Sequence, residues 1–135
     1  MRELDPFERL CIEFSLEGNI EELVQLRDTV DYVRVNRSRF TGVGFVSELS
    51  LLSGATPTSV GNGVLCDIDG ETDNLQHGFG IVVFVTDGRL SALEGFTFDE
   101  SWPSTLLLPR LTYTTVPRVL SRTVSGFTTQ TLSRR

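Results

Sequence analysis

The sequence predicts an α+β fold, in which two N-terminal helices pack on a single, curved antiparallel sheet of about five strands. Three observations predict this fold: capped helix patterns near the N-terminus, alternating apolar residues in the middle of the chain, and an Asp-Gly turn between two apolar runs. The chain has 135 residues, of which 39% are hydrophobic, and this suits one globular domain.

Two short helices open the predicted domain. Asp5 is a suitable N-cap, Pro6 suits the first helical position, and Glu8 completes a capping box. The expected apolar stripe of this helix is Phe7, Leu10, Cys11 and Phe14. Gly18 ends the helix, and the capping pattern repeats at Asn19. The expected stripe of the second helix is Ile20, Leu23 and Val24, with Leu26 and Val30 beside it.

Strands are predicted for the middle of the chain. Residues 43–51 alternate between apolar and polar, which predicts a half-buried strand, and residues 32–35 and 64–68 suit shorter ones. Residues 79–86 and 89–98 flank Asp87-Gly88, a favoured two-residue hairpin turn. This turn predicts that residues whose numbers sum to 175 face each other. Both faces of the hairpin are largely apolar, so it belongs in the centre of the sheet.

The charge of the chain is divided. Residues 1–100 hold all 18 acidic residues and 7 arginines, a net charge of −11, whereas residues 101–135 hold 5 arginines and no acid. We therefore predict an α+β core domain over residues 1–103. Residues 104–135 would supply a C-terminal strand and a Ser/Thr/Arg-rich tail, packed on the same domain or on a second copy. A homodimer is expected, because two short helices cannot cover both apolar faces of the hairpin.

Composition excludes several classes of function. The net charge of −6 argues against nucleic-acid binding, which needs a basic surface. The polar N-terminus and the shortness of the longest apolar run, residues 81–85, argue against a signal peptide and a membrane span and favour a cytoplasmic protein. Cys11 and Cys66 are expected to be small buried residues, and no metal or cofactor is predicted.

One segment resembles a catalytic motif. Residues 64–70, with Asp67 and Asp69 followed by glycine, resemble the first motif of the haloacid dehalogenase-like phosphatases. That resemblance implies a nucleophilic aspartate, but the family also needs a downstream basic residue, normally lysine, and a late acidic motif. The chain has no lysine, and no acid follows Glu100. We therefore expect a solvated acidic turn here, and no catalytic residue is assigned.

The candidate site surrounds the far end of the hairpin. In the predicted register Glu94 faces Ile81 on an apolar side, where a carboxylate needs a partner or has a function. His77 would face Phe98, and Arg34, Arg37 and Arg39 form a basic cluster that could pair with Glu94. The candidate binding residues are Glu94, His77, Phe96, Phe98, Asp99, Glu100 and Trp102.

Two functions fit these residues. The favoured one is a non-enzymatic binding or interaction module, whose acidic-aromatic surface binds a protein partner with a basic surface. The alternative is a small-molecule pocket on the curved sheet, in which Glu94 and His77 would be candidates for acid/base catalysis. The single histidine has no identifiable serine or cysteine nucleophile beside it, which argues against a catalytic triad.

Residues 41–45 and 85–103 resemble a group of small bacterial proteins. These proteins share an Asp-Gly-Arg-Leu…Leu-Glu-Gly hairpin, followed by an acidic and aromatic segment that ends in Trp-Pro. The resemblance covers residues 5–103 and implies a small α+β domain without an established activity. The tail from residue 104 does not share it, and this abrupt change suits a protein carried on a mobile gene cassette.

Overall fold

A mixed sheet of nine strands dominates the computed structural model of the protein, which describes residues 1–132. The helices are α1 (Pro6–Ser15) and α2 (Glu21–Arg27), with a 3-10 turn at Val30–Tyr32. The strands are β1 (Arg2–Glu3), β2 (Val33–Phe40), β3 (Gly44–Leu51), β4 (Gly63–Glu71), β5 (Phe79–Thr86), β6 (Arg89–Thr97), β7 (Arg110–Tyr113), β8 (Arg118–Arg122) and β9 (Phe127–Thr131). Their order is β1-β2-β3-β6-β5-β4-β9-β8, and β7 also pairs with β4.

The prediction of about five antiparallel strands is therefore wrong. Within residues 1–132 the sheet has nine strands, and one of its pairings is parallel. Residues 104–135, which the sequence predicts to supply one C-terminal strand, contain three, β7, β8 and β9. The Ser- and Thr-rich sequence of residues 110–131 does not alternate clearly between apolar and polar. β7 and β9 both pair with β4 of the same chain, and the β4–β9 pairing is parallel. Residues 133–135, the end of the predicted tail, lie outside the described residues.

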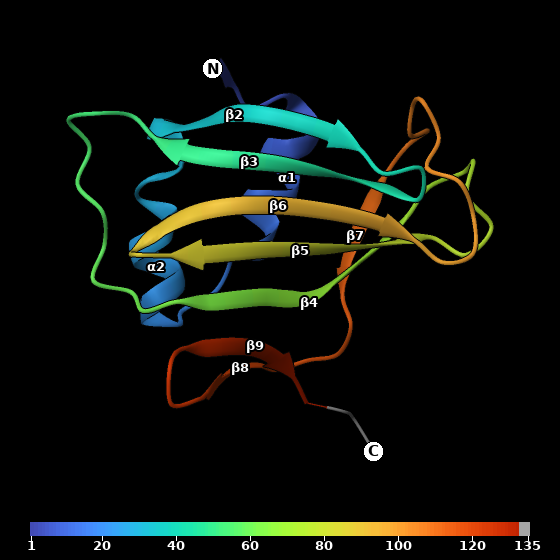
Figure 1. The fold of residues 1–135 in the computed structure, drawn as a ribbon. Helices are drawn as coiled ribbons and strands as arrows, with labels where there is room; N and C mark the ends of the chain where they lie inside the picture. The colour runs from blue at the N-terminus through green and yellow to red at the C-terminus, as the bar shows by residue number, and fades with distance from the viewer. Residues whose placement is uncertain (133–135) are drawn as a thin grey trace.

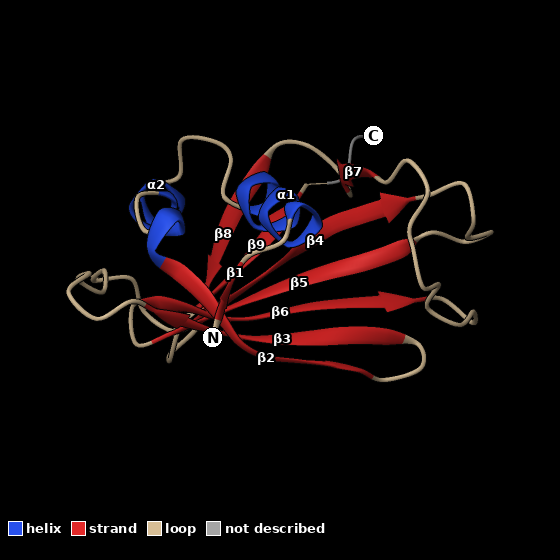
Figure 2. Cartoon of the chain, turned by 90° about the horizontal axis from the view of Figure 1, so that it is seen from above, coloured by secondary structure: helices blue, strands red, loops and turns tan. Residues whose placement is uncertain are grey.

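The helices cover only one face of the sheet. Figures 1 and 2 show the sheet curving around α1 and α2, so that β8 and β9 come up beside α1. The main apolar core fills the space between the helices and this concave face. In the part of the chain that the structure describes, no helix covers the convex face. The largest fully buried side chains include Phe79, Ile12, Leu16, Leu23, Leu26, Leu65, Ile81, Leu90 and Leu93.

The predicted start of α1 is confirmed. Asp5 accepts a hydrogen bond from the backbone N–H of Glu8, and the Glu8 side chain accepts one from the backbone of Asp5. The predicted apolar stripe is only partly right, because Leu10 is exposed and Ile12 is fully buried. In α2 the buried residues are Leu23 and Leu26, whereas Val24 is exposed.

The hairpin of β5 and β6 is confirmed, but its register changes along its length. Asp87 and Gly88 have φ angles of 52° and 77°, as expected for a turn of this kind. The pairs next to the turn follow the predicted sum of 175, as in Thr86↔Arg89. A β-bulge then leaves Ser91 without a partner, and the later pairs sum to 176.

This bulge reverses the predicted face of Glu94. Glu94 pairs with Val82 instead of facing Ile81, and it lies on the convex face of the sheet. Phe96 shares this face and pairs with Gly80. A Cβ atom at Gly80 would overlap the ring of Phe96, so the glycine provides the space in which the ring lies against the sheet.

Candidate functional site

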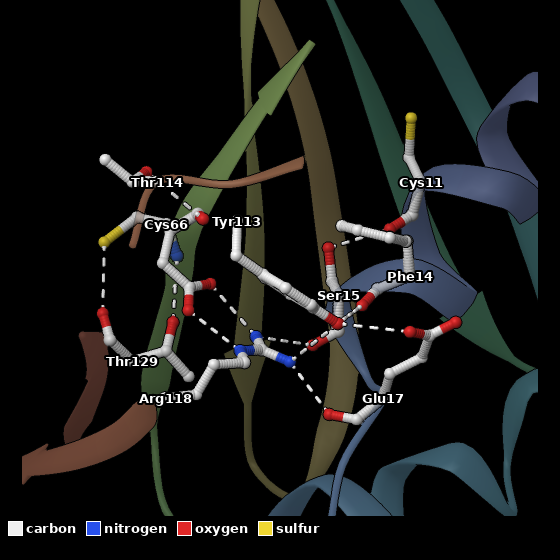
Figure 3. A network of polar contacts seen from close by, with 10 residues as sticks. Cys11, Phe14, Ser15, Glu17, Cys66, Tyr113, Thr114, Arg118 and Thr129 are labelled. Atoms are coloured by element: carbon white, nitrogen blue, oxygen red, sulfur yellow. Dashed lines mark hydrogen bonds and ion pairs between the residues drawn. The ribbon is translucent and has the colours of Figure 1, made fainter. Parts of the chain in front are cut away.

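A buried ion pair occupies the position that resembles a catalytic motif (Figure 3). The Arg118 guanidinium on β8 donates to both carboxylate oxygens of Asp67 on β4, at 2.8 and 3.0 Å. It also donates to the backbone carbonyls of Ser15 and Glu17 at the end of α1, both at 2.9 Å. The guanidinium carbon lies 4.5 Å from the ring centre of Tyr113.

These contacts give Asp67 a structural role. Its side chain is 3% exposed and that of Arg118 is 9% exposed, so neither is open to a substrate. The expected solvated turn is wrong at this position, because residues 67–71 continue strand β4. Cys66 is likewise exposed rather than buried as predicted, whereas Cys11 is fully buried. Burial raises the pKa of the Cys11 thiol well above its usual range.

Glu94 lies among apolar side chains on the convex face. It sits between Val46 of β3 and Val82 of β5 in the ladder. Within residues 1–132 its carboxylate makes no side-chain hydrogen bond or ion pair, so the predicted arginine partner is not found. Arg37, a member of the predicted basic cluster, pairs instead with Glu48 at 3.0 Å.

His77 and Glu100 are neighbours through the backbone. The Glu100 carboxylate accepts hydrogen bonds from the backbone N–H groups of Gln76 and His77, at 2.9 and 2.8 Å. These bonds lower the pKa of Glu100 from its ordinary value. His77 lines a hollow together with Phe98, and Glu94 does not belong to the lining of this hollow.

Exposed apolar side chains gather where β2, β3 and β6 reach one end of the sheet. The Phe96 and Phe98 rings meet edge to face with centroids 5.5 Å apart. The backbone N–H of Thr97 donates to the carbonyl of Val43, which brings the turn between β2 and β3 beside them. We call these exposed residues, with the neighbouring carboxylates, the acidic-aromatic end: Val43, Glu94, Phe96, Phe98, Asp99 and Glu100.

Trp102, in contrast, turns toward the concave face. Its ring centre lies 5.2 Å from that of Phe45 and 5.6 Å from that of Phe79. The Trp102 ring is one wall of a groove of about 380 Å³ that lies between the start of α1, strands β2 and β3, and the segment 102–109. We call it the Trp102 groove. Its other walls include Arg2, Phe7, Glu8, Ser38, Phe40, Phe45 and Ser47.

Sequence reasoning missed most of this groove. The sequence predicts Phe7 and Glu8 only as parts of the first helix, and it predicts no strand over residues 38–40. The only local signal was the excess of aromatic residues near Trp102. The other walls come from distant segments that meet only in the folded chain.

Glu8 is the buried charge of the Trp102 groove. Its side chain is 4% exposed, and Oε1 lies 2.7 Å from Nη1 of Arg2. Ser47 donates a hydrogen bond of 2.6 Å to Oε2, and the backbone N–H of Asp5 donates one of 2.9 Å to Oε1. Burial by itself would raise the pKa of Glu8, but these hydrogen bonds outweigh it and leave the pKa below its ordinary value.

We expect Glu8→Gln to remove part of the pH dependence of stability. Because the folded pKa of Glu8 lies below its unfolded value, this carboxylate stabilises the fold above pH 4.5, and the contribution is lost as the pH falls below that value. The variant should lose about 1–2 kcal/mol at pH 7 and less at pH 3, measured by urea unfolding at both values.

Glu13→Gln is the matched control, because Glu13 is an exposed carboxylate on the same helix. It should keep the pH dependence of the wild-type protein. An identical pH dependence in wild type and Glu8→Gln would show that the Glu8 carboxylate makes no such contribution.

The fold and these surfaces define a sheet-rich protein, rather than the predicted α+β fold, with two helices on one side of a curved mixed sheet, an open convex face, and a groove on the helix side. Comparison of the chain with protein-family models, with curated proteins and with solved structures gives no match. Neither helix in residues 1–132 has the length and apolar character needed to cross a membrane.

Proposed function

We propose that the protein is a non-enzymatic interaction module, which binds a partner with a basic surface through its acidic-aromatic end. The observation that carries the proposal is the clustering of exposed apolar side chains there. Phe98 is 43% exposed and Val43 is 54% exposed, and Phe96 lies beside them. Single exposed apolar side chains are common on soluble proteins, whereas clusters of them often mark interaction sites.

The charge of the acidic-aromatic end supports a basic partner. Glu94, Asp99 and Glu100 are its ionisable side chains, and all three are acidic. Aromatic side chains supply much of the binding energy at protein interfaces, whereas surrounding charges select the partner and speed its approach. An aromatic cluster with acidic neighbours therefore fits a partner that presents an apolar residue among arginines or lysines.

The arrangement favours binding over catalysis. Glu94 does not line the hollow that His77 lines, and the Glu100 carboxylate accepts hydrogen bonds from backbone N–H groups. Acid/base chemistry needs both groups within hydrogen-bond reach of one substrate. Self-association is a related proposal, because the convex face carries half-buried Val46, Val82 and Phe84, and no helix within residues 1–132 lies over them.

Peptide selection tests the proposed function. Phage-displayed random dodecapeptides, selected on the wild-type protein, should become enriched in sequences that combine arginine or lysine with an apolar residue. We expect the double variant Phe96→Ser/Phe98→Ser to weaken their binding about tenfold or more, which corresponds to the loss of one interface hot spot. Binding would be measured with the synthetic peptides by fluorescence anisotropy.

Val124→Ser is the control, since Val124 is also exposed but lies between β8 and β9. It should bind the selected peptides as the wild type does. If none of the selected peptides depends on Phe96 and Phe98, or if the enriched sequences are acidic, the proposed function is wrong.

A further inference from the structure

The outer edge of β2 is open for most of its length. β1 pairs with β2 only at Arg34 and Val35, and among the described residues no strand pairs with this edge from Asn36 to Phe40. Residues 36–40 are all exposed. An open edge carries backbone donors and acceptors that another extended chain can pair with.

The ladder shows which backbone groups point outward. The Thr41 N–H donates to the Gly44 carbonyl at 2.9 Å, and bonded and non-bonded pairs alternate from there along an antiparallel ladder. Phe40 and Ser38 therefore belong to the non-bonded pairs with β3, in which the N–H and C=O groups face away from β3. The hydroxyl oxygens of Ser38 and Ser47 lie 2.9 Å apart. This short distance fits a pair without backbone hydrogen bonds, in which the two side chains lie closer together.

The Trp102 groove lies directly beside this edge. The side chains of Ser38 and Phe40 line it together with Phe7, Phe45 and Trp102. Phe40 is 77% exposed, although its ring is large and apolar. The charges of Glu8 and Arg2 neutralise each other within the groove, so an apolar side chain can enter without facing an unpaired Glu8 carboxylate. Asp5 and Arg39 also line the groove.

The other side of the same strand segment is basic. Arg37 and Arg39 alternate with Ser38 and Phe40, so their side chains point to the convex face. Arg39 makes no ion pair within residues 1–132, and Arg37 has only the exposed Glu48. A second copy that docked by the same edge would bring four arginines together, and like charges on paired strands are destabilising.

We infer that β2 and the Trp102 groove bind an extended acidic peptide segment as an added strand. An apolar side chain of this segment opposite Ser38 enters the Trp102 groove, and acidic side chains opposite Arg37 and Arg39 lie on the convex face. Backbone pairing supplies affinity and the alternating side chains supply specificity. The inference goes beyond the proposed function, because it concerns the edge of β2 and the Trp102 groove and a partner of opposite charge. The two sites adjoin on the convex face, where Val46 pairs with both Arg39 and Glu94.

A short synthetic peptide tests this site. The probe is fluorescein-labelled Gly-Asp-Phe-Asp-Leu-Gly, whose order matches the alternation along β2. We expect saturable binding by fluorescence anisotropy, together with a shift in the emission of Trp102, the only tryptophan in the chain. Arg39→Glu should weaken the Kd about tenfold or more, which is the size of one lost charge-assisted contact.

Backbone pairing is tested separately. Ser38→Pro removes an outward N–H from the edge, and N-methylation of the probe removes the matching donors, so each should weaken binding about tenfold. Arg89→Glu is the control. Arg89 is exposed, but it begins β6, whereas the row of the sheet that contains Arg39 crosses β6 at Glu94, near the other end of that strand. It should leave the Kd unchanged. If circular dichroism shows that Ser38→Pro is unfolded, the N-methylated probe and Arg39→Glu still decide the question.

Several results would overturn the inference. The inference is wrong if the N-methylated probe binds as tightly as the original probe, or if Arg39→Glu binds the probe as tightly as the wild type does. It is also wrong if a probe with lysine in place of aspartate binds as tightly as the original. A dimer detected by light scattering without peptide, and dissolved by Arg39→Glu or Ser38→Pro, would assign the edge to a second copy instead. The variant Phe96→Ser/Phe98→Ser should still bind the probe, so failure of the proposed function is distinguishable from failure of this inference.

Discussion

Replacing Arg118 with methionine is expected to lower the free energy of unfolding by about 3–5 kcal/mol. Methionine keeps much of the volume but leaves the Asp67 carboxylate buried without its two hydrogen bonds. The carbonyls of Ser15 and Glu17 at the end of α1 also lose their donor. Urea unfolding followed by circular dichroism measures this loss.

Two further variants separate the pair from its surroundings. Arg122→Met is the matched control, since this exposed arginine ends the same strand, and it should cost no more than about 1 kcal/mol. The double variant Asp67→Leu/Arg118→Met removes both charges, so we expect it to be more stable than Arg118→Met alone. A loss below about 1 kcal/mol in Arg118→Met would show that the ion pair contributes little.

Phe79→Ala is expected to cost about 3–5 kcal/mol and to disturb the Trp102 groove. Phe79 is fully buried, and its ring centre lies 5.9 Å from that of Phe7 and 5.6 Å from that of Trp102. Its removal leaves a cavity behind the Trp102 wall of the groove. Thermal and urea unfolding measure the stability, and the Trp102 emission maximum should move to longer wavelength as water reaches the ring.

Phe98→Ala is the control for this substitution. Phe98 is exposed and its main aromatic neighbour is Phe96, so its loss should cost no more than about 1 kcal/mol and leave the Trp102 emission unchanged. Equal losses in the two variants would mean that Phe79 is not part of a tightly packed core.

The elements that the sequence predicted correctly depend on neighbouring residues. The start of α1 follows from Asp5, Pro6 and Glu8, which cap the helix within four positions of one another. The hairpin follows from Asp87 and Gly88, whose φ angles suit the turn. The size of the sheet could not be predicted in this way. β9 pairs with β4 about sixty residues away, and no pattern within β9 identifies that partner.

The sequence predicts the segment that carries the candidate site but not the faces on which its side chains lie. One bulged residue, Ser91, moved Glu94 to the other face of the hairpin, because the side chains of a strand alternate at every position. Asp99 has a φ of 59°, which interrupts the extended backbone between Phe98 and Trp102. The structure accordingly places Phe98 at the acidic-aromatic end and Trp102 in the groove on the helix side.

The contacts of Arg118 also affect the order in which parts of the sheet can form during translation. Asp67 emerges from the ribosome 51 residues before Arg118, and Ser15 emerges 103 residues before it. Until Arg118 follows, the Asp67 carboxylate must stay hydrated. The partners of β4 are also made late, β7 just before Arg118 and β9 just after it. The nascent chain therefore keeps the outer edge of β4 unpaired until β7 and β9 have been made.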